Sequence, residues 1–128
     1  MKKHNLNKLP LDGITVLDLT NVLSGPYATL ILSDLGANVI KVEKPSGDDS
    51  RGFGPFVKNE SGYFISLNRG KKSIVLDLNA DEDKKIFLTL LSKVDVLVDN
   101  YRPRTLEKFG FNWKLISKKF PKLILVML

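Results

Sequence analysis

The 128 residues of this chain are enough for one domain with its own core and too few for two ordinary domains. Hydrophobic residues at 43% and charged residues at 27% are typical of a soluble globular protein, and the lack of cysteine excludes thiolate catalysis, disulfides and cysteine-ligated metals. The net charge is +6, but the cations are scattered, so nucleic acid is not an expected partner.

Residues 1–8 are polar and are expected to form a flexible leader, with His4 in it, while residues 9–128 form the domain. The leader lacks the apolar stretch of a secretory signal. No apolar run approaches the ~20 residues that span a bilayer. A cytoplasmic protein with no membrane partner is therefore expected.

The first unit of the domain reads as strand, helix and strand. An apolar run at 14–19 predicts a buried strand, a turn follows at 20–26, an amphipathic helix runs to Leu35, and a second strand covers 39–43. Such a unit places a ligand-sized turn at the carboxyl end of its first strand.

The middle of the chain is less regular. Residues 44–61 are rich in Pro, Gly, Ser and Asp and predict a long surface loop. Residues 63–67 fit either a short helix or a strand, 68–72 form a basic turn, and 73–78 have the composition of a buried strand.

A helix is predicted at about 80–92, with Asn79 or Asp81 as its cap. Its predicted apolar face carries Ile86, Phe87, Leu90 and Leu91. A short strand at 94–98, helices at 105–109 and 113–118, and a last apolar run at 123–128 follow.

This alternation of strands and helices predicts an α/β fold with a parallel sheet. The run at 123–128 has almost no polar residue, as expected of a strand covered on both faces. Because the chain stops there, the domain is expected to be incomplete.

Ligands of such sheets bind outside the carboxyl ends of the strands, where the turns at 20–26 and 100–105 are expected. Gly25 permits close approach of a ligand, and the next helix N-terminus offers N–H groups to a phosphate. Equally, Gly25 and Pro26 fit the simple start of a helix. Neither GxGxxG nor GxxxxGK[ST] is present.

Other polar residues give weaker signals. The loop 47–52 lacks the oxygen ligands of a calcium site and fits turn chemistry better, so no metal is expected. Asp12, Asp18 and Asp34 have no paired carboxylate or histidine nearby in sequence, which favours capping or surface roles over base catalysis. Most lysines read as solvated surface, and no nucleophile–base pair is found.

Several motifs in order resemble the start of the class III CoA-transferases, the CaiB/BaiF family that includes formyl-CoA transferases. They cover nearly the whole chain from Leu9 onward and lie at residues 10–20, 22–26, 34–43, 47–51, 67–74, 76–78 and 95–103. The resemblance implies transfer of CoA between a thioester and a carboxylic acid, through mixed anhydrides and a thioester on an aspartate. It also implies a Rossmann-like domain and an interlocked homodimer, with acyl-CoA as substrate and no tightly bound cofactor.

Carried over by position, the resemblance implies a set of CoA contacts on the turns after the strands. They are Asn21, Val22, Leu23, Ser24, Lys44, Leu76, Asn79, Asn100, Tyr101, Thr105 and Lys108. Lys44 and Lys108 are expected to meet phosphate, although solvated surface explains each lysine equally well. Tyr101 offers an aromatic face to adenine or an apolar wall to pantetheine.

Two positions depart from the family pattern. Leu23 replaces a polar glutamine beside the reacting acyl group of formyl-CoA transferases, which disfavours formyl or oxalyl substrates. Arg104 stands where glycine is common, and either crowds the turn or adds a phosphate contact.

The resemblance also places the nucleophilic aspartate beyond Leu128, so no catalytic residue is expected in this chain and it should be inactive alone. Some members of the family are acyl-CoA racemases, which leaves an N-terminal part of a racemase as one alternative. A non-catalytic module that binds CoA or a nucleotide is another.

Overall fold

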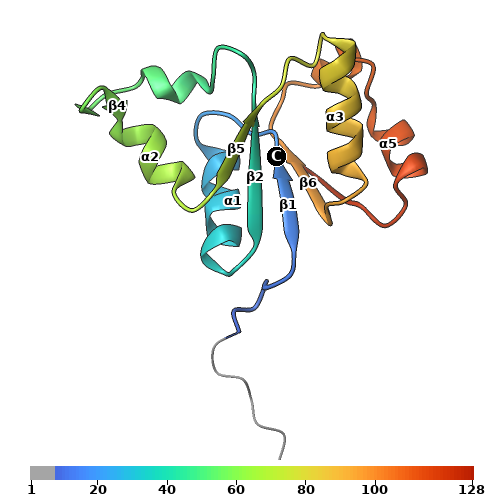
Figure 1. The fold of residues 1–128 in the computed structure, drawn as a ribbon, viewed down its shortest axis with the longest axis horizontal. Coiled ribbons are helices and arrows are strands. Elements are labelled where there is room, and N and C mark those ends of the chain that lie inside the picture. Colours follow the sequence, from blue (N-terminus) through green and yellow to red (C-terminus); the bar gives the residue numbers. More distant parts are fainter. Residues whose placement is uncertain (1–7) are drawn as a thin grey trace, which may run out of the picture.

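The structure is a computed structural model that describes residues 8–128; residues 1–7 of the expected leader, His4 among them, lie outside the described residues. The described chain folds around a five-stranded sheet in which all neighbouring strands are parallel (Figure 1). The strands are β1 (Thr15–Asp18), β2 (Asn38–Glu43), β5 (Lys72–Val75), β6 (Val96–Asp99) and β7 (Ile124–Met127). Their order, β5-β2-β1-β6-β7, confirms the predicted α/β parallel sheet and has the Rossmann arrangement.

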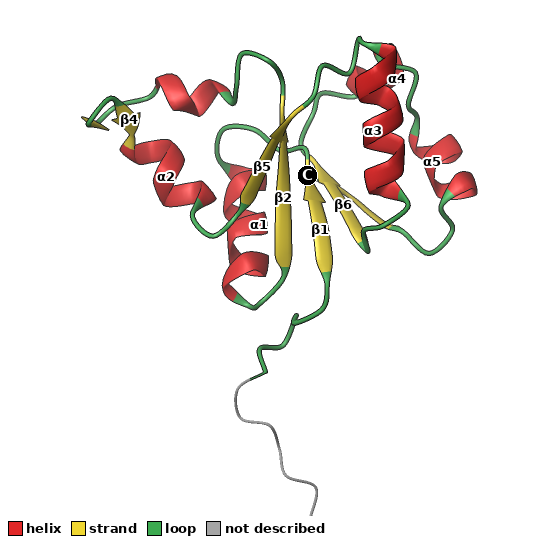
Figure 2. Ribbon diagram, in the orientation of Figure 1, coloured by secondary structure: helices red, strands yellow, loops and turns green. Residues whose placement is uncertain are grey.

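Helices lie on both sides of this sheet (Figure 2). On one side are α1 (Ser24–Asp34) and α2 (Gly62–Asn68), and on the other are α3 (Asp81–Leu91), α4 (Thr105–Lys108) and α5 (Trp113–Lys119). The chain moves outward from β1 through β2 to β5, then crosses to β6 on the other side of β1. Because crossovers are right-handed, this reversal puts the two sets of helices on opposite faces.

Two apolar clusters, one on each face, join the layers. The larger cluster packs the sheet against α3, α4 and α5, and in it the rings of Phe87 and Phe111 meet edge to face with centroids 5.0 Å apart. The smaller lies on the α1 side. Leu17 of β1 belongs to the larger cluster and its neighbour Val16 to the smaller. A central strand buried on both faces explains why the run at 14–19 is largely apolar.

The predicted surface loop at 44–61 is mostly exposed, but part of it has regular structure. This segment contains a short 3-10 helix, η1 (Asp49–Gly52), and a hairpin of β3 (Phe56–Val57) and β4 (Glu60–Ser61). Elements of two to four residues are too short to produce a hydrophobic period, so composition alone suggested a loop. The Ser61 hydroxyl accepts a hydrogen bond from Phe64 N at 3.0 Å and caps α2, which settles 63–67 as helix.

The predicted helix at 80–92 is α3, but its cap and apolar face differ from the prediction. Neither Asn79 nor Asp81 caps it; Ala80 is the N-cap residue and makes no side-chain hydrogen bond. Phe87 and Leu91 are buried one turn apart, whereas Ile86 is 43% exposed. Adjacent helical residues differ by about 100° in direction, so burial of Phe87 turns Ile86 toward the surface.

The last apolar run also differs from its prediction. It forms β7, which pairs only with β6 among the described strands, and Ile124 and Met127 remain 60% and 67% exposed. The expectation of a strand covered on both faces is therefore wrong for the residues described. An apolar composition shows that a strand is suited to burial. How much of it is buried depends on the strands and helices that pack against it, and β7 lies at the edge of the described sheet.

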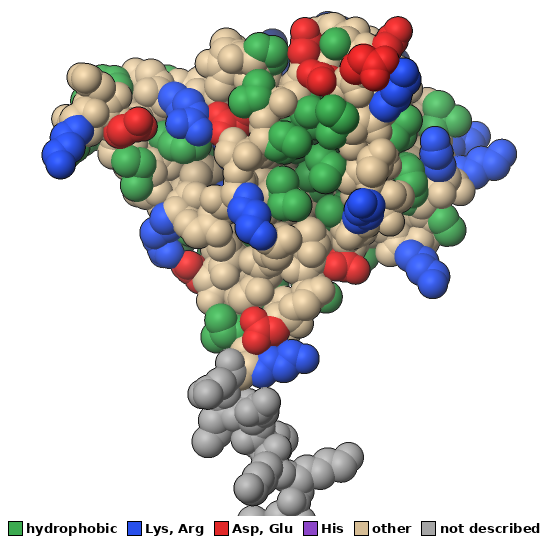
Figure 3. Space-filling view, in the orientation of Figure 1, with side chains coloured by type: hydrophobic (Ala, Val, Ile, Leu, Met, Phe, Trp, Pro, Cys, Tyr) green, Lys and Arg blue, Asp and Glu red, His purple; other side chains and the backbone are tan. Residues whose placement is uncertain are grey.

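The surface facing the viewer in Figure 3 mixes charges of both signs. Lysine and arginine side chains are spread over this face with carboxylates between them, rather than gathered in one stripe. Along residues 8–128 no helix is long and apolar enough to cross a membrane.

Candidate functional site

The candidate site lies at the carboxyl edge of the sheet, between β1 and β6. The chain leaves β1 toward one face and β6 toward the other, so the loops after these two strands diverge and leave a crevice. A reciprocal amide contact joins the loops: Asn21 N donates to Asn100 Oδ1, and Asn100 Nδ2 donates to Asn21 O, each at 2.8 Å. The two turns that the sequence indicated therefore meet.

Tyr101 lines three hollows along this edge. One lies toward the ends of β6 and β7, and the other two, the first and second hollows, cover the ends of β1, β2 and β5. The first, of about 620 Å³, is lined by Asn21, Val22, Leu23, Ser24, Asp49, Asn100, Tyr101, Arg102 and Thr105. The second, of about 380 Å³, is lined by Val42, Lys44, Pro45, Ser46, Leu76, Asp77, Leu78, Asn79, Tyr101 and Phe109. Both volumes fall in the range of small-molecule sites. Together they form a strip that passes from the end of β1, over Tyr101, to the ends of β2 and β5.

Ten of the eleven predicted contact residues line these hollows. Seven belong to the first, and Lys44, Leu76 and Asn79 belong to the second. Lys108 is the exception, because it lies exposed on α4 and lines neither hollow. The structure thus brings distant parts of the chain to one edge, while their contacts with a ligand stay predictions.

The first turn has a constrained backbone that continues into α1. Val22 has φ +68°, a left-handed conformation that is unusual for a β-branched residue. Gly25 lies so close to Thr20 that an added Cβ would be 2.8 Å from Thr20 Oγ1 and closer still to Thr20 Cβ and Cγ2. Leu23, the N-cap residue of α1, makes no side-chain hydrogen bond. The free N–H groups of this helix start can therefore receive a phosphate or a carbonyl oxygen.

The second turn supplies the wall between the hollows. Tyr101 N donates to Asp99 Oδ1 at 2.7 Å, which fixes the start of the turn. Burial raises the pKa of both Tyr101 and Asp99, so the Tyr101 phenol stays neutral at physiological pH. Arg104 has φ +67°, a conformation that glycine adopts freely, so this departure from the family pattern falls where a side chain costs most.

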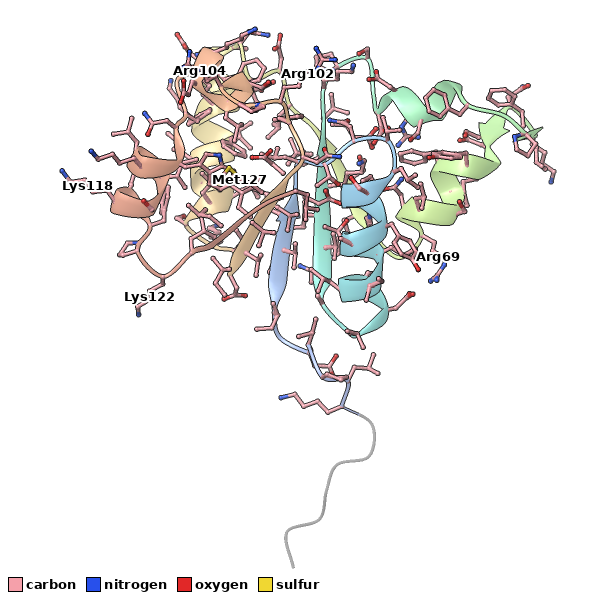
Figure 4. The ribbon with its side chains drawn as sticks, turned by 180° about the vertical axis from the view of Figure 1, so that it is seen from behind. Arg69, Arg102, Arg104, Lys118, Lys122 and Met127 are labelled. Carbon is pink, nitrogen blue, oxygen red and sulfur yellow. The ribbon has the colours of Figure 1, made fainter. Side chains whose placement is uncertain are left out.

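The cations near the site differ in their surroundings. Lys44 Nζ pairs with Asp49 Oδ1 at 2.6 Å, and both side chains are more than half exposed. Figure 4 shows Arg102 and Arg104 together at the carboxyl edge of the sheet, and Arg69 away from that edge beside α2. The edge thus offers several positive groups to an anionic ligand.

The chain is similar to known proteins along most of its length. The family model described as CoA-transferase family III matches residues 11–128. The chain belongs to CoA-transferase family III. The α/β sheet with its crevice at the end of β1 is therefore part of the fold of this family.

Relatives of the family III chain include enzymes with named activities. It is 51% identical over 118 residues to acetyl-CoA:oxalate CoA-transferase of Acetobacter aceti, covering 91% of this chain and 30% of the relative. It is 48% identical over 120 residues to succinyl-CoA:glutarate CoA-transferase of Homo sapiens, covering 92% of this chain and 27% of the relative. The chain thus spans about 30% of the length of the curated relatives it matches.

Solved structures agree on the arrangement. A CaiB/BaiF family protein from Brucella suis superposes with a TM-score of 0.87 at 38% identity, covering 94% of this chain and 33% of that one. A hypothetical protein from Mycobacterium tuberculosis gives 0.85 at 40% identity, with 93% and 33% coverage.

Sequence reasoning missed the charges beneath the first turn of the family III chain. Asp18 is fully buried, so it is not a surface residue, and its Oδ1 accepts a hydrogen bond from Thr20 N at 2.8 Å at the start of the turn. The side chains of Lys41 and Lys71 are each 1% exposed, so the solvated reading of lysines is wrong for these two. A detectable signal existed for Lys41, because it lies inside an apolar strand run that a parallel sheet buries on both faces.

Each of these three buried charges has an opposite partner. Lys41 Nζ lies 2.8 Å from Asp48 Oδ2, and Lys71 Nζ lies 3.1 Å from Asp18 Oδ2. Burial raises the pKa of Asp48, but hydrogen bonds from Lys41 and Ser50 outweigh it and hold the pKa below its usual value. Burial lowers the pKa of Lys71 against the opposing effect of Asp18.

A third carboxylate continues this arrangement toward the hairpin. Glu43 accepts two hydrogen bonds from the Arg51 guanidinium, at 2.7 and 2.8 Å, and one from Ser73 Oγ at 2.6 Å. Burial raises the pKa of Glu43, yet these bonds and that from Asp48 N lower it to about 2. The Arg51 guanidinium also stacks 3.7 Å above the Phe64 ring, which ties η1 to α2.

Proposed function

We propose that this chain forms the CoA-binding wall of an enzyme that moves CoA between an acyl-CoA thioester and a small carboxylic acid. The observation that carries the proposal is the strip of two hollows, which meet at Tyr101 and collect ten of the residues implied by the family pattern. CoA esters are elongated ligands with a phosphorylated end and an acyl end. The strip suits such a ligand, because Lys44 lies in the hollow at one end and Leu23 in the hollow at the other.

The two ends of the strip suggest how the ligand lies. Lys44 and Asn79 line the second hollow and suit the phosphate-bearing end of CoA. Tyr101 provides a flat wall for the pantetheine arm. Leu23 and Ser24 line the first hollow, and with the free N–H groups of α1 they suit the thioester end.

The acid is proposed from the relatives and from Leu23. The relatives are named for oxalate, mesaconate, glutarate and malate, all of which are dicarboxylic acids. We propose a small dicarboxylic acid as acceptor. Leu23 favours an acid larger than oxalate, whereas the relative at 51% identity is named for oxalate, so oxalate belongs in the test.

Two further expectations belong to this proposal. The acyl-carrying aspartate would come from a part of the enzyme outside these 128 residues, and the enzyme would act as an interlocked homodimer. The 30% share of the relatives' length supports the first expectation, because most of a relative lies outside the matched region.

The test uses the protein expressed from its complete reading frame. It is incubated with succinyl-CoA or acetyl-CoA and a panel of acids that includes oxalate, mesaconate, glutarate and malate, and new CoA esters are separated by chromatography. A new CoA ester with at least one acid is expected, and none from residues 1–128 alone. Turnover by the 128-residue chain, or no transfer to any acid by the complete protein, contradicts the proposal.

A further inference from the structure

The turn at 20–24 is held from beneath by the ion pair of Lys41 and Asp48. Lys41 Nζ donates to Thr20 O at 2.6 Å and lies 2.8 Å from Asp48 Oδ2. Asp48 Oδ1 accepts a hydrogen bond from Val22 N at 3.4 Å. The pair therefore contacts a carbonyl and an amide of the same turn, and the two side chains are 1% and 0% exposed.

Asp48 is itself held in place by its neighbours. Its backbone N donates to Glu43 Oε2 at 3.0 Å, and its Oδ1 accepts from Ser50 N at 2.8 Å and Ser50 Oγ at 2.6 Å. These bonds leave the carboxylate little freedom to follow a moving turn. Asp48 thus connects the turn to the end of β2 and to η1, and these two elements hold the turn in position.

The backbone of the turn shows why such support is needed. Val22 has φ +68°, and a strained conformation of this kind persists only where the surroundings determine it. Apolar side chains of similar volume often stabilise a core as well as a buried ion pair does. Apolar side chains cannot form hydrogen bonds with a carbonyl and an amide, however. The two charges in this position are therefore explained better by their hydrogen bonds to the turn than by a contribution to stability.

We infer that Lys41 and Asp48 are positioning residues of the proposed CoA site, whose ion pair sets the conformation of turn 20–24. This inference rests on the proposed function. Lys41 and Asp48 line neither hollow, so they act on the ligand only through Val22, Leu23 and Ser24.

The test is the double variant Lys41→Met/Asp48→Asn in the protein from the complete reading frame. It removes both charges together, which avoids leaving one buried charge unpaired. The amide oxygen that replaces the Asp48 carboxylate can still accept from Ser50, but the donor to Thr20 O is lost. Affinity for CoA, measured by calorimetry, is expected to fall about 10- to 100-fold, the size of the loss when residues that orient metal ligands are removed. The KM for acyl-CoA should rise with little change in kcat.

The matched control is Arg69→Met/Asp34→Asn. It removes the same types of charge from an exposed pair, 2.6 Å apart, that lies away from the carboxyl edge (Figure 4). CoA affinity of this control should equal that of the unaltered protein.

A milder variant, Ser50→Ala, keeps every charge and removes one hydrogen bond to Asp48. It should weaken CoA binding about threefold, which is less than the effect of losing a full hydrogen bond to a charged group.

The outcomes separate this inference from the proposed function. If the unaltered protein does not bind CoA, the proposed function fails. If the unaltered protein binds CoA and the folded double variant binds it equally well, the positioning role is wrong. A fall in kcat without a rise in KM also overturns it. Should the double variant not fold, unchanged affinity in folded Ser50→Ala has the same meaning.

Discussion

Replacement of Gly25 by alanine tests how tightly the first turn is packed. The new Cβ would lie 2.8 Å from Thr20 Oγ1, where ordinary contact begins at 3.4 Å, and even closer to the Cβ and Cγ2 of that residue. Thr20 cannot easily retreat, because its N and Oγ1 donate to Asp18 at 2.8 and 2.5 Å and its O accepts from Lys41 at 2.6 Å.

Two opposing effects determine how Gly25→Ala changes the free energy of unfolding. Alanine in place of glycine within a helix usually stabilises by about 0.5–1 kcal/mol. Overpacking a dense site costs about 1–3 kcal/mol. For Gly25→Ala we expect the clash to win and the free energy of unfolding to fall by roughly 1–2 kcal/mol. Because the turn must shift to relieve the clash, kcat/KM for acyl-CoA should fall by up to about 100-fold.

The assay combines denaturant unfolding of the complete protein with steady-state kinetics. The matched control is Gly52→Ala, since a Cβ at Gly52 meets nothing within 4 Å and Gly52 has no left-handed φ. This control should leave both stability and kcat/KM nearly unchanged. A Gly25→Ala protein that is more stable than the unaltered protein and equally active would refute the reasoning about this turn.

Three further predictions concern the walls of the site and its charges. Tyr101→Ala should weaken CoA binding about tenfold by calorimetry, the effect of losing one aromatic contact, while Tyr101→Phe should leave it nearly unchanged. Lys44→Met should weaken CoA binding and reduce its dependence on salt, whereas Asp49→Asn, which frees Lys44 from its 2.6 Å ion pair, should strengthen binding slightly in the same titrations. The pKa of Glu43 is lowered from 4.5 to about 2, so its contribution to stability is complete above pH 4.5 and is lost as the pH falls through about 2. Unfolding midpoints of Glu43→Gln should therefore fall less than those of the unaltered protein between these pH values, and an equal fall in both would count against the ion pair with Arg51.

The sequence was sufficient to predict the sheet and the edge where the candidate site lies. The runs at 14–19 and 94–98 are largely apolar because β1 and β6 are central and buried on both faces. Since parallel strands end at one edge, the turns that follow them had to meet there, and the bonds between Asn21 and Asn100 show that they do. The predictions failed where burial depends on neighbours, as at Ile86 and in β7.

The charges beneath the turn could not be paired from sequence. Lys71 and Asp18 are 53 residues apart, and nothing in either motif indicates the other as its partner. Their meeting depends on the order of strands and on the length of the segment between β2 and β5. The lysines were expected at the surface because burying an unpaired ammonium group costs free energy. A carboxylate partner offsets that cost, so a paired lysine can be buried.

The lysines around the candidate site are of two kinds, exposed and buried. The Lys44 and Asp49 pair is exposed, and such pairs contribute about 1 kcal/mol or less, so a phosphate can displace Asp49 from Lys44 at little cost. The net charge of +6 would attract the proposed phosphorylated ligand from a distance but would not fix its orientation. Orientation must come from groups that do not move, and those are the backbone of turn 20–24 and the wall at Tyr101. In the proposed site Lys41 would therefore act through geometry and the exposed Lys44 through charge, and salt should weaken the second contribution much more than the first.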